Sequence, residues 1–212
     1  MKKLVVFDVD GTLVDSEPLH KISRDIMLNR LGIYSEQLSD SAIGVGKRDF
    51  WERVQKEYGL SLDCNALTVE EFDILISVIR ERGVKLSTGV KELLEFLKTS
   101  GVKMAVASSS DGTYVDEILK ATGIKDYFNV VCTGDLVKHT KPDPEIYLKT
   151  MDFSNEVAKD TLAVEDSTLG ILAAVNAKIT CIGFNANDMG AQQDFSPCEQ
   201  VVSDMRDIVK FV

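Results

Sequence analysis

Short apolar runs alternate with helical patterns along most of this chain, and this alternation limits the folds open to it. The first run, Leu-Val-Val-Phe at residues 4–7, is continuous, as expected of a strand buried on both faces. Apolar residues in the later segments recur at spacings of three and four, as in Val90, Leu93, Leu94 and Leu97, which is the period of a helix face. Comparable strand-like runs occur at residues 104–107, 130–132, 162–164 and 180–182, with a weaker one at 201–202. The pattern predicts an α/β fold with a mostly parallel sheet and helices on both faces.

The stretch from about residue 16 to about residue 85 breaks this alternation, because it contains helical patterns and no convincing strand. Three apolar stripes in it are followed by Gly32, Gly59 and Gly83, and glycine commonly ends a helix. The stretch is longer than a typical connection between two strands. We therefore expect an α/β core domain formed by residues 1–15 and 86–212, and an inserted α-helical domain formed by residues 16–85.

The charge balance of the chain is acidic. It has 24 Lys and Arg residues against 34 Asp and Glu residues, a formal net charge of −10. Nucleic acids and anionic membrane surfaces are bound through clustered basic residues, so we expect neither as a partner. An acidic enzyme with an anionic substrate needs a local cation to offset its own charge, and a metal ion is the usual one.

The cysteines and the apolar runs bear on the compartment. Cys64, Cys132, Cys181 and Cys198 are widely spaced, which favours reduced thiols over disulfides or a zinc site. Asp8 cuts the N-terminal apolar run below the roughly 7–15 residues of a signal-peptide core, and no run approaches the roughly 18–20 residues of a membrane span. We expect a cytoplasmic monomer.

Carboxylates follow two of the expected strands, at the end of a parallel sheet where ligands bind. Asp8 and Asp10 follow the first strand and share one side of an extended segment, and Glu165 and Asp166 follow a later strand. A cluster of these groups is costly without a cation, because the like charges repel. Oxygen ligands beside a phosphate suit Mg²⁺, so the sequence predicts Mg²⁺ as the cofactor.

Groups suited to an anion occur near two further strands. Ser108 and Ser109 begin a Ser-Ser-Ser-Asp-Gly turn that offers hydroxyl and backbone N–H donors. Lys141, in Lys-Pro-Asp-Pro before a helix containing Tyr147, supplies the positive charge that a phosphoryl transition state needs.

These four patterns together resemble the motifs of the haloacid dehalogenase-like superfamily of aspartate-nucleophile phosphotransferases. Phe-Asp-Val-Asp-Gly-Thr-Leu-Val-Asp-Ser at residues 7–16 matches the first motif, Ser108 the second, Lys141 the third, and Glu165-Asp166 the fourth. The motifs occur in order over nearly the whole chain. The inserted helices resemble the small α-helical cap of the β-phosphoglucomutase-like subfamily, and the resemblance implies a doubly wound, Rossmann-like core.

The resemblance also implies a mechanism. Asp8 would attack phosphorus to form an aspartyl-phosphate, and Asp10 would act as general acid and then as general base. Mg²⁺ would be held by Asp8, the Asp10 main-chain carbonyl and Asp166, with Glu165 binding directly or through water. The transferring phosphoryl group would be held by side chains of three motifs, namely Thr12, Ser108, Ser109 and Lys141.

Two residues of the expected cap are further candidates. His20 stands where phosphomutases of the subfamily carry a histidine that positions the acid/base aspartate, and the alternative is a surface histidine. Lys47, in Gly-Lys-Arg, is a candidate ligand for a second phosphate, and the alternative is the solvated start of a helix.

The leading hypothesis is a Mg²⁺-dependent phosphatase acting on a small phosphorylated metabolite, a sugar phosphate. The alternative is a β-phosphoglucomutase-type phosphomutase, which His20 and Lys47 favour and which the lack of an Arg-Lys pair near residues 77–80 opposes. A haloacid dehalogenase is disfavoured, because it needs neither the second aspartate nor the metal carboxylates. The intact Asp8 disfavours a non-catalytic binding protein on the same scaffold.

Overall fold

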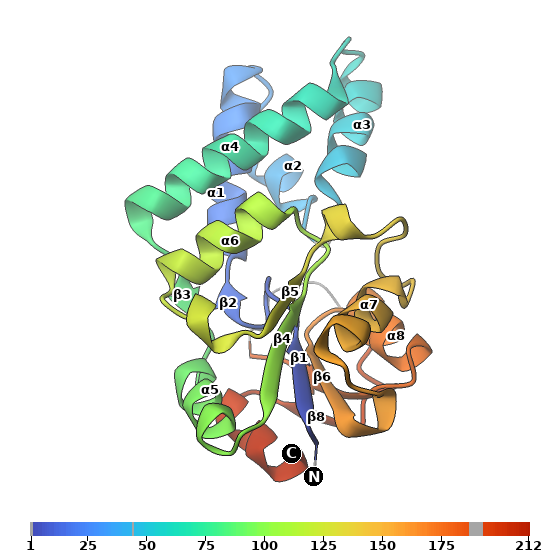
Figure 1. Ribbon diagram of the computed structural model, residues 1–212. Helices are drawn as coiled ribbons and strands as arrows, with labels where there is room; N and C mark the ends of the chain where they lie inside the picture. The colour runs from blue at the N-terminus through green and yellow to red at the C-terminus, as the bar shows by residue number, and fades with distance from the viewer. Residues whose placement is uncertain (1, 44, 187–192) are drawn as a thin grey trace. The chain divides into compact units, whose positions relative to one another are not determined.

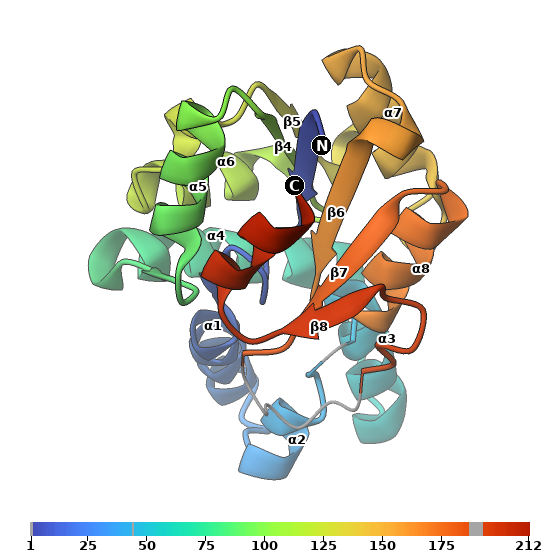
Figure 2. The same ribbon diagram turned by 90° about the horizontal axis from the view of Figure 1, so that it is seen from below.

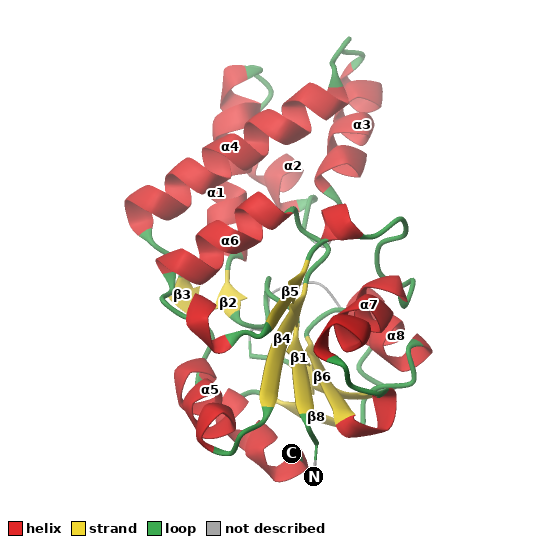
Figure 3. Ribbon diagram, in the orientation of Figure 1, coloured by secondary structure: helices red, strands yellow, loops and turns green. Residues whose placement is uncertain are grey.

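A computed structural model of the protein describes residues 2–43, 45–186 and 193–212. The chain divides into two compact units, one formed by Met1–Asp15 with Lys85–Val212 and the other by Ser16–Val84 (Figure 1). The first unit contains both strands and helices, and the second is built from helices (Figure 3). Within the described part of the chain, no helix has the length and apolar character that a membrane span requires.

The first unit is built on a parallel sheet with the strand order β5-β4-β1-β6-β7-β8. Its strands are β1 (Leu4–Phe7), β4 (Lys103–Ala107), β5 (Val130–Cys132), β6 (Thr161–Glu165), β7 (Thr180–Phe184) and β8 (Gln200–Val202). Each apolar run that predicted a strand forms one, and the weakest run forms the edge strand β8. The predicted α/β class with a mostly parallel sheet is therefore confirmed.

Strand β1 lies between β4 and β6, and its position explains its sequence. All four of its residues are fully buried. A central parallel strand is covered on both faces, so it needs apolar side chains at consecutive positions and not at alternate ones. Full burial of each such side chain contributes roughly 1.5–3 kcal/mol. The run at residues 4–7 is thus the centre of the core.

Helices cover both faces of this sheet (Figure 2). One face carries α5 (Val90–Thr99) and the 3-10 segment Met205–Phe211, and the other carries α7 (Glu145–Ser154) and α8 (Thr168–Asn176). The predicted stripe of α5 is buried at every position. Two of the helices begin with a side-chain cap: Asp111 accepts from the Thr113 N–H before α6 (Gly112–Ala121), and Ser167 accepts from the Gly170 N–H at α8. Such caps satisfy backbone donors that a helix start leaves unpaired.

Two very short strands were not predicted. β2 (Val14–Asp15) and β3 (Lys85–Leu86) pair antiparallel, where the chain leaves the α/β unit and returns to it. Two residues are too few to show a period in the sequence. The remaining short elements of this unit are 3-10 turns at Lys125–Tyr127, Gly134–Leu136 and Ala158–Asp160. All four cysteines of the chain are free thiols.

The second unit consists of α1 (Glu17–Arg30), α2 (Glu36–Asp40), α3 (Lys47–Tyr58) and α4 (Cys64–Arg82). Helices α1 and α3 both pack on α4. Their apolar stripes meet in a small core that includes Met27, Leu28, Phe50, Trp51 and Val54. Gly59 and Gly83 cap the ends of α3 and α4 at positive φ, where glycine carries no steric penalty.

Candidate active site

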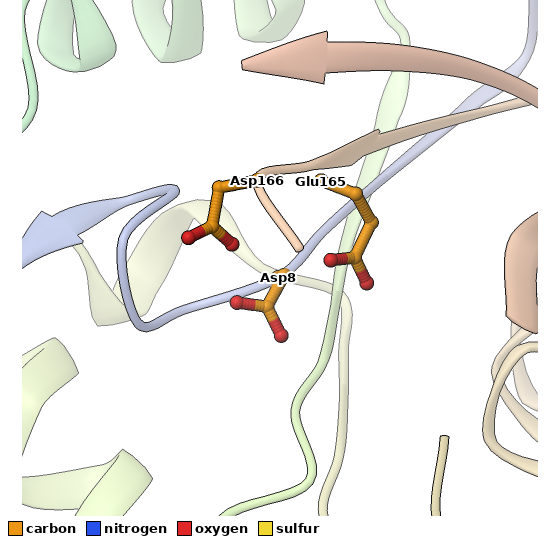
Figure 4. Close-up of side chains that lie close together, drawn as sticks. All are labelled: Asp8, Glu165 and Asp166. Carbon is orange, nitrogen blue, oxygen red and sulfur yellow. The ribbon is translucent and has the colours of Figure 1, made fainter. Parts of the chain in front are cut away.

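The order of the strands brings the sequence motifs to one edge of the sheet. In the registers on either side of β1, Phe7 pairs with Val106 of β4 and with Val164 of β6. Asp8 therefore leaves the sheet beside Glu165 and close to the end of β4. Asp8, Glu165 and Asp166 each offer one carboxylate oxygen, and the three oxygens lie within 4.8 Å of one another (Figure 4). Three of the four carboxylates that the sequence predicts to converge form this cluster, and Asp10 is not among them.

Lys141 is buried against two of these carboxylates. Its Nζ donates to Asp8 Oδ1 at 2.5 Å, to Glu165 Oε1 at 2.6 Å and to the carbonyl oxygen of Ala107 at 2.9 Å. Burial lowers the pKa of Lys141, but the charges of Asp8 and Glu165 outweigh this and hold that pKa above its usual value. The residue is therefore a permanent cation, and its three donors are all used.

Tyr147 on α7 is a member of this cluster that the sequence did not single out. Its hydroxyl donates to Glu165 Oε1 at 2.6 Å, and its ring centroid lies 5.5 Å from Lys141 Nζ. The side chain is fully buried. Burial, with the nearby charge of Glu165, raises the pKa of Tyr147 well above its usual range, so the phenol stays protonated. In the sequence, Tyr147 is indistinguishable from an apolar residue on a buried helix face.

The Gly-Thr of the first motif holds Asp166. Thr12 is buried, and its Oγ1 donates to Asp166 Oδ1 at 3.1 Å. Gly11 has a φ of 78°, and a Cβ at this position would lie 2.0 Å from Asp166 Oδ2. Only glycine satisfies both the backbone angle and the contact. Thr12, predicted to bind phosphate, thus acts in this structure on the carboxylate cluster.

The cluster carries more negative charge than its surroundings balance. Burial raises the pKa of Asp8 well above its usual value, and the charges of Glu165, Asp166 and Asp10 add to this, while Lys141 opposes it. Burial and the charge of Glu165 raise the pKa of Asp166 to about 7, although the Thr12 hydrogen bond opposes this rise. Among the residues that the structure describes, Glu165 Oε2 is the one buried side-chain oxygen or nitrogen without a hydrogen bond. An oxygen-only set with surplus charge and an unpaired buried oxygen fits a hard divalent cation.

Asp10 is directed differently from Asp8. Its Oδ2 accepts from Ser110 Oγ at 3.0 Å, and its Oδ1 accepts from the hydroxyl of Tyr114, a buried residue of α6. Sequence reasoning missed both partners. Ser110 lies in the predicted turn and was a recognisable candidate, whereas Tyr114 belongs to the buried face of a helix and carries no distinguishing signal.

The serines after β4 shape the same edge. Ser108 is buried, its N–H donates to the carbonyl oxygen of Cys132, and its Oγ accepts from the Ser110 N–H at 3.1 Å. Ser109 is exposed. The two serines are therefore placed differently, with Ser108 bound into the turn and Ser109 at the surface.

His20 and Lys47 belong to the helical unit. His20 lies on α1, and its carbonyl oxygen accepts from Ser23 Oγ. Lys47 is the first residue of α3, and its Nζ pairs with Glu71, whose side chain is almost completely buried. The Lys47 side chain is only 13% exposed, and its Nζ lies 5.1 Å from the ring centroid of Phe72. Lys47 is therefore not the solvated helix start that the alternative interpretation expected.

Comparison with known proteins supports the motif assignment. Residues 5–184 match the family model of haloacid dehalogenase-like hydrolases. The chain is 34% identical over 184 residues to the phosphorylated carbohydrates phosphatase of Thermotoga maritima, covering 82% of this chain and 81% of that protein. It is also 34% identical over 189 residues to the phosphoglycolate phosphatase of Vibrio parahaemolyticus, covering 85% of this chain and 82% of that protein.

A solved structure shares the fold. The crystal structure of CbbY from Rhodobacter sphaeroides in complex with phosphate matches with a TM-score of 0.86, at 22% identity, over 98% of this chain and 96% of that chain. The family model covers most of the chain, and its range includes the strand ends where the carboxylates and Lys141 meet. The chain therefore belongs to the haloacid dehalogenase-like hydrolase family.

Proposed function

We propose that this protein is a Mg²⁺-dependent phosphatase that hydrolyses a small phosphorylated metabolite, of the sugar-phosphate class, through an aspartyl-phosphate on Asp8. The observation that carries this proposal is the setting of Asp8, which lies in a buried carboxylate cluster and accepts a hydrogen bond from Lys141. The relatives named as phosphatases of phosphorylated carbohydrates and of phosphoglycolate support the substrate class.

The residues that would hold Mg²⁺ are Asp8, Glu165 and Asp166, whose carboxylates form the cluster. The resemblance to the family adds the main-chain carbonyl of Asp10. When bound, the ion would supply the positive charge that keeps the carboxylates ionised and would withdraw charge from the phosphoryl group. Within the part of the chain that the structure describes, Glu165 Oε2 is the buried side-chain oxygen that makes no hydrogen bond.

The chain's own residues divide the reaction between them. An oxygen of Asp8 would attack phosphorus, and the bond from phosphorus to the ester oxygen would break. Asp10 would give a proton to that leaving oxygen, and would then take a proton from the water that attacks the aspartyl-phosphate and releases inorganic phosphate. Lys141 would exchange one of its present hydrogen bonds for a phosphoryl oxygen, and Ser108 would donate its hydroxyl to another.

The alternative is a β-phosphoglucomutase-type phosphomutase. It would use the same two aspartates and differ only in the acceptor, a sugar hydroxyl in place of water. We assign substrate selection to the helical unit, which is the proposed cap domain and contains His20 and Lys47. The pairing of Lys47 with Glu71 reduces the charge that Lys47 offers to a second phosphate, which favours the phosphatase.

The test is a panel of sugar phosphates and phosphoglycolate assayed with Mg²⁺, in which both inorganic phosphate and isomer formation are measured. We expect phosphate release by the wild type and no detectable release by Asp8→Asn. The control is Asp126→Asn, which changes an exposed aspartate and should leave the rate unaltered. A wild-type rate of phosphate release by Asp8→Asn would disprove the proposal that Asp8 is the nucleophile. Isomer formation without net phosphate release would favour the phosphomutase.

A further inference from the structure

Tyr147 places a phenol hydroxyl inside the carboxylate cluster. The side chain is fully buried, and its hydroxyl donates to Glu165 Oε1 at 2.6 Å. Lys141 donates to the same oxygen at 2.6 Å from the segment just before α7. One stretch of chain, from Lys141 to Tyr147, thus delivers two donors to one carboxylate oxygen.

These two donors make the oxygens of Glu165 inequivalent. Oε1 accepts both hydrogen bonds, whereas Oε2 is buried and accepts none. Gly170 packs against the same carboxylate, because a Cβ on that residue would lie 1.9 Å from Oε2 and 2.4 Å from Oε1. Rotation of the carboxylate would break two short hydrogen bonds, so its orientation is fixed with one acceptor oxygen left unused.

The hydroxyl of Tyr147, and not its ring, is the group that contacts the Glu165 carboxylate. A phenylalanine would fill the same space and keep an aromatic face 5.5 Å from Lys141 Nζ. Burying a hydroxyl without a partner is unfavourable, and here Glu165 is its hydrogen-bond acceptor. The position of the phenol therefore depends on the position of Glu165, and the reverse also holds.

We propose that Tyr147 is a positioning residue, whose hydroxyl holds the Glu165 carboxylate in the orientation that binds the divalent cation. This inference rests on the proposed function, since Glu165 has a cation to bind only if the cluster holds one. Without the hydroxyl, Oε1 keeps Lys141 as its single donor and the carboxylate gains freedom to turn. Mutation of a residue that orients a metal ligand typically lowers metal affinity or activity by about 10–100-fold.

The experiment compares Tyr147→Phe with Tyr127→Phe. Tyr127 also donates its hydroxyl to a glutamate, Glu95, but on the exposed surface. Mg²⁺ affinity is measured by titration calorimetry on protein freed of metal with EDTA, and the Tm and circular dichroism without metal verify the fold. We expect the Kd for Mg²⁺ to rise by about 10-fold or more in Tyr147→Phe, with no change in Tyr127→Phe.

A double-mutant cycle with Glu165→Gln identifies the route of the effect. If Tyr147 acts through Glu165, adding Tyr147→Phe to Glu165→Gln changes the Kd for Mg²⁺ by less than about twofold. An unaltered Kd in Tyr147→Phe, or an equal effect in both backgrounds, overturns the positioning role. Mg²⁺-dependent hydrolysis by the wild type would then leave the proposed function standing, whereas a wild type that binds no Mg²⁺ overturns both.

Discussion

At the scale of single residues, the site is governed by an excess of buried negative charge. Asp8 and Asp166 both have raised pKa values because burial removes them from water, and neighbouring carboxylates add to the effect. Lys141 supplies one positive charge to Asp8 and Glu165. One ammonium group cannot neutralise two carboxylates, and Asp166 makes a third. The metal-free protein therefore holds protons in the cluster that a divalent cation would displace.

This excess charge leads to a pH-dependent stability. The pKa of Asp166 is raised to about 7 in the folded protein from an unfolded value of 3.8, so the folded state binds more protons between these values. The free energy that the raised pKa of Asp166 contributes to folding is fully present below about pH 4. It is lost as the pH rises through about 7. In EDTA we expect Asp166→Asn to stabilise the protein at about pH 8, by at most about 4 kcal/mol, and not at about pH 4.

Urea unfolding at several pH values checks this expectation. The quantity of interest is the difference in unfolding free energy between Asp166→Asn and the wild type at each pH. A difference that does not change with pH would contradict the assigned cause. Added Mg²⁺ at about pH 8 should stabilise the wild type and not the variant, because the variant lacks one of the proposed ligands.

At the scale of elements, the site depends on how closely the start of α8 approaches the end of β6. Gly170 lies in the first turn of α8, and a Cβ there would lie 1.9 Å from Glu165 Oε2 and 2.4 Å from Oε1. We expect Gly170→Ala to displace Glu165 and to weaken Mg²⁺ binding by about 10-fold or more, as for other supporting residues of metal sites. Calorimetric titration with Mg²⁺ measures the effect. An unchanged affinity would show that α8 tolerates the side chain by moving.

Helices α3 and α4 of the second unit are joined by a buried ion pair. Glu71 accepts from Lys47 Nζ and, at 2.9 Å, from Trp51 Nε1. Lys47→Met would leave the buried carboxylate of Glu71 without its counter-charge, and removing one partner of a buried pair costs about 3–5 kcal/mol. The control is Arg48→Met, which breaks an exposed pair with Glu52 and should change the stability little.

Urea unfolding of both variants compares the two pairs directly. Changing Glu71 to Gln in the Lys47→Met background removes the stranded charge, so it should recover part of the lost stability. Equal effects of Lys47→Met and Arg48→Met would show that the Lys47–Glu71 pair is no more important than a surface contact.

At the scale of the whole molecule, the sequence predicts the architecture better than the contacts inside the site. The strands can be predicted from the sequence, because a parallel sheet buried on both faces requires continuous apolar runs, as at residues 4–7. Asp8, Glu165 and Asp166 are recoverable because they follow such runs. Tyr114 and Tyr147 are not, because each lies on an apolar helix face and its hydroxyl finds a partner only once that helix packs. The pairing of Lys47 with Glu71 depends likewise on the packing of two helices.

The net charge of −10 sets the last expectation, which concerns the molecule as a whole. An acidic protein disfavours anions in general, and the donors of Lys141 are already taken by Asp8, Glu165 and Ala107. Inorganic phosphate should therefore bind only when Mg²⁺ is present. With Mg²⁺, phosphate at 100 times its Kd adds about 2.7 kcal/mol of stability, and each kcal/mol raises the Tm by about 2–4 °C. In EDTA the same phosphate should leave the Tm unchanged, with chloride at equal ionic strength as the control. Equal stabilisation by phosphate with and without Mg²⁺ would mean that Lys141 and the backbone donors bind the anion unaided.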